Sequence, residues 1–76
     1  MRAIVHTESG SIYRFYDNDA GEQCCIREGA HPCRYLHVAP VVVPVIGQRM
    51  SFRGMLDSEP PTLRFTRTTP VVEIEQ

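Results

Sequence analysis

Three cysteines and two histidines lie within one short central stretch, and thiolate sulfur with imidazole nitrogen is a donor set that Zn²⁺ favours. Cys25, His31, Cys33 and His37 would supply two sulfur and two nitrogen ligands within 13 residues. Zinc modules usually bring two cysteines together as C-x₂-C, whereas Cys24 and Cys25 are adjacent and would point to opposite faces of a strand. A zinc-stabilised domain is therefore one alternative. The other is a buried cysteine that packs as a small apolar side chain, with surface histidines.

The same residues suggest cysteine catalysis, in which a thiolate is activated by a neighbouring imidazole. Cys25 or Cys33 beside His37 would form such a pair. The sequence supplies no orienting carboxamide and no evident oxyanion hole, and so short a chain leaves little room for a substrate cleft. We therefore expect a protein that is not an enzyme.

All eight basic residues are arginine, and guanidinium groups suit phosphate and carboxylate. Strand alternation predicts that Arg49, Arg53 and Arg64 point outward, where they would form a positive stripe if the two C-terminal strands pair. Small barrels bind single-stranded nucleic acid with such a stripe and stacking aromatic rings. Tyr16 and Tyr35, the aromatic residues expected on outer faces, lie elsewhere, and the net charge is −1. Nucleic-acid binding is therefore a second alternative, beside ordinary charge pairing between strands.

Three valines between two prolines form the most apolar part of the chain, Val41 to Val43. An exposed valine edge can pair with a strand of another chain, although the flanking prolines limit that pairing. We expect this segment to contact a second copy or a host protein, and the alternative is that the valines complete the core. The predicted partner-binding residues are Val41, Val42, Val43 and Tyr35.

The elements that position these residues are predicted from two-residue periodicity, because no stretch has helical periodicity. Turn residues separate the alternating stretches. Strands are predicted over 2–7, 12–16, 23–27, 34–38, 47–53 and 62–75. Residues 1–76 should form one all-β domain without a long helix. It would be a small antiparallel barrel or two packed sheets of five to six strands, in the Src-homology-3-like or OB-like size class.

The predicted core follows from this alternation, with one exception in the last strand. Leu63 and Phe65 occupy odd positions, whereas Val72 and Ile74 occupy even ones, so a bulge or bend is predicted near Thr69 and Pro70. The expected core residues are Ile4 or Val5, Tyr13, Phe15, Ile26, Leu36, Val38, Met50, Phe52, Leu63, Phe65, Val72 and Ile74.

Size and composition set the remaining expectations. A chain of 76 residues buries only about 60% of its unfolded surface, so self-association or a metal would help to stabilise it. The N-terminus lacks the apolar run of a signal peptide, and prolines break the longest apolar run, so we expect a complete, cytoplasmic protein without membrane contact. In that compartment the three cysteines should be free thiols.

Two short motifs resemble a known group. Residues 5–13 read V-H-T-E-S-G-S-I-Y, and residues 68–74 read T-T-P-V-V-E-I. They resemble the T-x-S-G-S-x-Y opening and the T-T-P-V-x-x-I closing strand of short β-proteins from actinobacteria and their phages. The glycine-led stretch 47–52 also fits that group. The resemblance implies a β fold and a GC-rich bacterial or phage source, which agrees with the absence of lysine, and it supplies no active residues.

Overall fold

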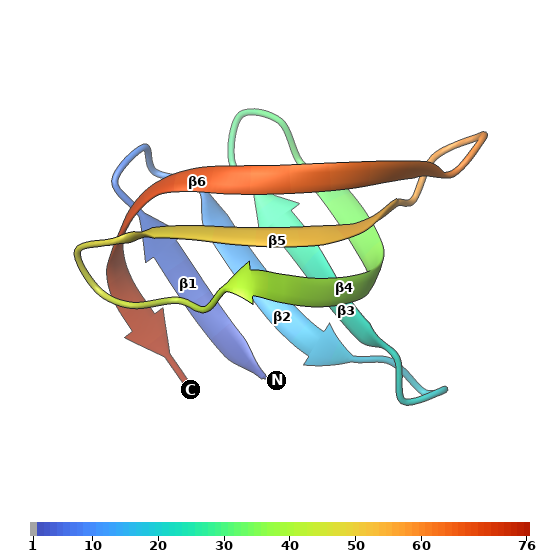
Figure 1. Cartoon of the computed structure of the whole chain (residues 1–76), viewed down its shortest axis with the longest axis horizontal. Helices are drawn as coiled ribbons and strands as arrows, with labels where there is room; N and C mark the ends of the chain where they lie inside the picture. Colours follow the sequence, from blue (N-terminus) through green and yellow to red (C-terminus); the bar gives the residue numbers. More distant parts are fainter. Residues whose placement is uncertain (1) are drawn as a thin grey trace.

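The computed structural model describes residues 2–76, which form six antiparallel strands and no helix (Figure 1). Each strand pairs with the next, and the last pairs with the first, so the sheet closes into a barrel. The predicted small antiparallel barrel is thus confirmed. Residues 2–76 contain no helix that could cross a membrane. The strands are β1 (Ala3–Thr7), β2 (Ile12–Asp17), β3 (Gln23–Glu28), β4 (Cys33–Val42), β5 (Arg49–Leu56) and β6 (Thr62–Glu75).

The barrel consists of two layers that share their longest strands (Figure 1). The β4, β5 and β6 strands form one layer, and β1, β2 and β3 cross behind it. The β6 strand pairs with β5 from Thr62 to Pro70 and then bends, so that Val71 to Glu75 pair with β1. In the same way, β4 pairs with β3 only near its start and with β5 over most of its length. Strands that serve both layers close a barrel of this size.

The core is centred on Phe52 of β5, which is 1% exposed. The rings of Tyr13, Phe15 and Tyr35 all meet the Phe52 ring edge to face, an arrangement that the aromatic quadrupole favours. The residues that pack in this cluster are Ala3, Val5, Tyr13, Phe15, Cys25, Tyr35, Val38, Met50, Phe52 and Val71.

The prediction for the middle of β4 was wrong. Tyr35 was expected on the outer face, but it is only 6% exposed, and Leu36, expected in the core, is half-buried on the outer side. The register with β5 shifts between Leu36 and Ala39, and His37 adopts a φ of 51°. This bulge adds one residue, so Tyr35 and Val38 both face the core although they are three positions apart.

The bend in β6 is confirmed, because the register with β5 shifts between the pairs Ser51–Arg67 and Arg49–Pro70. A second shift follows, since Thr7 pairs with Val71 whereas His6 pairs with Glu73. The parity of residues 62–72 is therefore the reverse of the expected one, and the buried residues there are Thr68 and Val71. Ile74, in contrast, packs against the core as predicted. Three residues expected in the core are exposed instead: Leu63 (67%), Phe65 (63%) and Val72 (53%).

Candidate interaction surface

The outer side of the β4–β5–β6 layer is a continuous surface of mostly apolar side chains, here called the front face. Its residues lie directly opposite one another on the three strands, so each row presents three side chains to the same side. Leu63 and Phe65 are its most exposed members. The rows are Leu36–Met55–Leu63, Ala39–Arg53–Phe65 and Val42–Ser51–Arg67, and none of these nine residues is acidic. Ser51 lies in its row but is only 5% exposed.

The front face continues into the predicted partner-binding segment. Residues 41–46, here called the valine segment, end β4 and lead towards β5. Val41, Val42 and Val43 are 54%, 44% and 57% exposed, so they do not complete the core. Val45 and Ile46, which follow Pro44, are also exposed. Of the predicted partner-binding residues, only Tyr35 lies outside this surface, because it is buried against Phe52.

One side of β6 has no strand beside it along half of its length. Within residues 2–76, residues 62–67 pair with β5 alone, because β1 joins β6 only from Val71 onward. This stretch, here called the β6 edge, contains no proline and ends where the register shifts between Arg67 and Pro70. Unpaired backbone N–H and C=O groups on such an edge can accept another strand. The corresponding edge of β4 is less suitable, because Pro40 lies within it and the register shifts beside it.

The three arginines of the predicted stripe do not share one face. Arg53 lies on the front face opposite Phe65, and Arg49 follows the same alternation along β5. Arg64 lies opposite Gly54, whose neighbour Arg53 faces outward, so Arg64 points to the other side of the sheet. Arg67, opposite Ser51, lies on the front face instead. The predicted inward and outward positions in this part of β6 are the opposite of those in the structure, which explains the placement of the arginines as well as that of Leu63 and Phe65.

Sequence analysis also missed the exposed aromatic ring of this surface. Phe65 lies next to Arg53 across the strands and two positions before Arg67 on its own strand. A phenylalanine in an alternating strand is normally expected in the core, so only the register of β6 could have placed it outside.

The four predicted zinc ligands are not gathered into one site. Cys25 is fully buried in the core, and Cys33 is half-buried at its margin. His31 is exposed in the β3–β4 turn. His37 points away with the β4 bulge, and its Nδ1 lies 2.6 Å from Oε2 of Glu22. Among residues 2–76, these four donors do not form a group close enough to hold one metal ion.

Burial also governs the acid–base chemistry of the core. Desolvation raises the pKa of the Cys25 thiol far above its ordinary value, and the nearby Cys33 and Cys24 act in the same direction. Burial likewise raises the pKa values of Tyr13 and Tyr35, with Arg27 opposing the shift at Tyr13. A thiol held protonated in this way is a poor nucleophile, so Cys25 lacks the activation that cysteine catalysis requires.

The opposite side of the barrel carries a second group of polar residues that sequence analysis missed. The Nε2 atom of His6 lies 2.6 Å from Oε2 of Glu75, and Glu73 offers a third donor atom, all within 4.8 Å of one another. The register brings them together, because His6 lies opposite Glu73 and two pairs away from Glu75 on the same face. The contact between His6 and Glu75 is sufficient to explain why these side chains lie close together.

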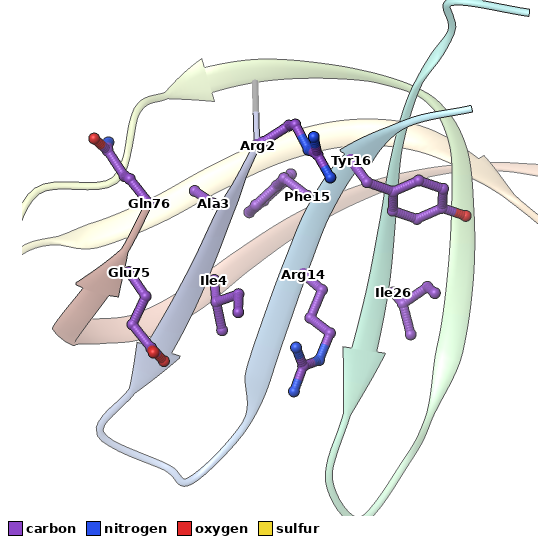
Figure 2. Close-up of a pocket in the computed structure, with 9 residues that line it drawn as sticks. All are labelled: Arg2, Ala3, Ile4, Arg14, Phe15, Tyr16, Ile26, Glu75 and Gln76. Atoms are coloured by element: carbon purple, nitrogen blue, oxygen red, sulfur yellow. The ribbon is translucent and has the colours of Figure 1, made fainter. Parts of the chain in front are cut away.

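Beside that group lies an open hollow of about 640 Å³ over the outer surface of β1, β2 and β3 (Figure 2). Ile4, Arg14 and Ile26 project from the three strands side by side and form part of its floor. The Nε atom of Arg14 donates a hydrogen bond to Oε1 of Glu28 over 2.6 Å, so its charge is already paired. The hollow is shallow, and its chemistry is less distinctive than that of the front face.

No protein-family model, curated protein sequence or solved structure matches this chain. The functional argument therefore depends on the surface itself.

Proposed function

We propose that this protein is a non-enzymatic interaction module that contacts another protein, or a second copy of itself, through the front face and the valine segment. The observation that carries this proposal is the gathering of exposed apolar side chains on one side of the barrel. Soluble monomers rarely expose large contiguous apolar patches, and such patches usually mark contact surfaces.

The composition of the surface supports a protein partner. Arginine and aromatic residues are enriched in protein interfaces, whereas acidic residues are depleted from them. Arg53, Phe65 and Arg67 lie together on the front face, among residues of which none is acidic. Each Å² of apolar surface removed from water contributes roughly 25 cal/mol, so covering Leu63 and Phe65 would add stability that a small core lacks. A partner other than a second copy is expected to present an apolar surface with acidic groups at its margin.

The test compares two double variants of the purified protein. Val43→Ser with Ile46→Ser removes exposed apolar side chains from the valine segment. Ala20→Ser with Ala30→Ser changes exposed residues in distant turns and is the matched control. The proposal predicts that the wild type and the control bind the same partner, or reach the same mass by light scattering, whereas the valine variant loses this association. Equal behaviour of all three proteins would argue against the proposal.

The position of Phe65 favours a second candidate function, the binding of single-stranded nucleic acid. A base could stack on the exposed ring while Arg53 and Arg67 contact phosphates. Fluorescence anisotropy with a labelled single strand should then show affinity that falls as salt rises. Arg67→Gln should weaken binding and reduce the salt dependence, whereas Arg34→Gln on β4, opposite Ile26, should not. Binding that is absent, or insensitive to Arg67→Gln, would exclude this candidate.

A further inference from the structure

We infer that the β6 edge pairs with the β6 edge of a second copy, antiparallel and centred on Phe65. This inference rests on the proposed function and names the partner of one part of that surface. Residues 62–67 have β5 on one side only and contain neither proline nor a bulge, so their backbone can accept a strand. A second copy fits this edge, T-L-R-F-T-R, because one register sets Phe65 against Phe65 while no arginine faces its equivalent.

The geometry of a two-fold axis limits the possible registers. If the front faces of both copies lie on the same side, the axis is perpendicular to the sheet and passes through one residue and its own copy. Arg64 or Arg67 at the axis would place an arginine directly against its equivalent, which is destabilising. Thr66 at the axis would pair only residues 65–67 of the edge. Phe65 at the axis pairs residues 63–67, which is the longest register that sets no arginine against its equivalent.

The Phe65-centred register also joins compatible side chains. It sets Phe65 against Phe65 of the second copy, and aromatic pairs of this kind stabilise antiparallel strands. The aliphatic part of Arg67 would cover Leu63 of the second copy, and Arg64 would face a Thr66 hydroxyl. The product is one continuous sheet in which the two front faces lie side by side.

The arginines of the two copies come near each other in this arrangement, although none lies directly opposite another. Moderate salt screens this repulsion, so the dimer should strengthen as salt rises from low concentration. That response is the reverse of the one expected for nucleic-acid binding.

The experiment measures mass by sedimentation equilibrium from micromolar to millimolar protein, where the wild type should rise from 8.6 kDa towards twice that value. Phe65→Arg and Phe65→Glu each place like charges at the axis, so each alone should remain monomeric. An equimolar mixture of the two should form a heterodimer, because the opposite charges then meet. Phe65 is exposed, and circular dichroism should show that both variants keep the fold.

A second measurement reports the register. In a Cys33→Ser background, Phe65→Cys should form an intermolecular disulfide on oxidation, since directly opposite residues bring their Cβ atoms close enough. Leu63→Cys, which faces Arg67 of the second copy, should not. A wild type that stays monomeric at millimolar concentration would overturn the inference. So would a dimer that persists in Phe65→Arg and cross-links through Leu63→Cys. If a partner still bound through the valine segment in that case, the proposed function would be supported and only the strand pairing would be rejected.

Discussion

The rings of Tyr35 and Phe52 lie 5.2 Å apart between centroids, with their planes at 85°. This contact joins the β4 side of the barrel to the centre of β5. Tyr13 and Phe15 of β2 meet the other sides of the same ring, so Phe52 links both layers. The core is thus organised around one phenylalanine.

Phe52→Ala should therefore be among the most destabilising single substitutions in the chain. Removing a fully buried aromatic side chain leaves a cavity between the layers and costs about 3–5 kcal/mol of unfolding free energy. Urea denaturation monitored by circular dichroism measures the loss. Phe65→Ala is the matched control, because that ring is 63% exposed, and it should change the free energy by less than about 0.5 kcal/mol. Similar losses for both variants would contradict the arrangement of β5 and β6.

Gly54 should resist even the smallest substitution. A Cβ atom at this position would lie 3.2 Å from the backbone oxygen of Leu36 and 3.2 Å from Cγ2 of Val38. Gly54→Ala forces β4 away from β5, and overpacking of this kind costs about 1–3 kcal/mol. Gly10→Ala tests a different effect. No atom lies within 4 Å of a Cβ at Gly10, but its φ of 90° is a backbone conformation that strains any residue with a side chain. A Gly54→Ala protein as stable as the wild type would show that the two strands are further apart.

The three cysteines should differ in reactivity. Cys24 and Cys25 are fully buried and Cys33 is only partly so, and the pKa of Cys25 is raised by burial. Thiol labelling of the native protein near neutral pH should therefore modify Cys33 first, and all three should react in denaturant. Mass spectrometry of the labelled peptides identifies the sites. Rapid native labelling of Cys25 would be incompatible with its place in the core.

Alkaline pH should destabilise the fold. In the unfolded chain Cys25 ionises near its ordinary pKa of 9.0, whereas burial keeps the folded thiol protonated at that pH. Above that pH the unfolded state binds fewer protons than the folded state. The contribution of Cys25 to the free energy of unfolding is therefore complete below about pH 9 and decreases as pH rises further. The raised pKa values of Tyr13 and Tyr35 extend the fall above their ordinary value of 10.0. Urea midpoints across this range measure it, and Cys25→Ala should reduce the slope. A slope unchanged by that substitution would assign the effect to the tyrosines.

Period-two alternation predicted the strands that run without interruption. Val5, Tyr13, Phe15, Met50 and Phe52 are buried as expected, because β1, β2 and β5 keep one side chain in and the next one out. Alternation failed where a bulge adds a residue. The bulge in β4 depends on a backbone conformation at one residue, and an apolar pattern contains no signal for it.

The candidate interaction surface was harder to predict, because of β6. Thr68 is buried, and its Oγ1 accepts a hydrogen bond from the backbone N–H of Met50 over 3.2 Å. A threonine in the core and a phenylalanine outside it invert the usual relation between polarity and burial. The sequence alone therefore assigned Leu63 and Phe65 to the interior. The valine segment was predicted as a contact surface because its two prolines mark it as poorly suited to the centre of a sheet.

The pairing of Ile4 with Glu75 has a consequence for how the protein is made. The β1 strand is synthesised before β6, and it can pair with its second neighbour only after the last residues of β6 have left the ribosome. Until then the nascent chain holds an open sheet, with its apolar interior available to chaperones and to other nascent chains. A translation product that stops before residue 71 would lack the part of β6 that pairs with β1 and closes the barrel. We expect cellular proteases to degrade it.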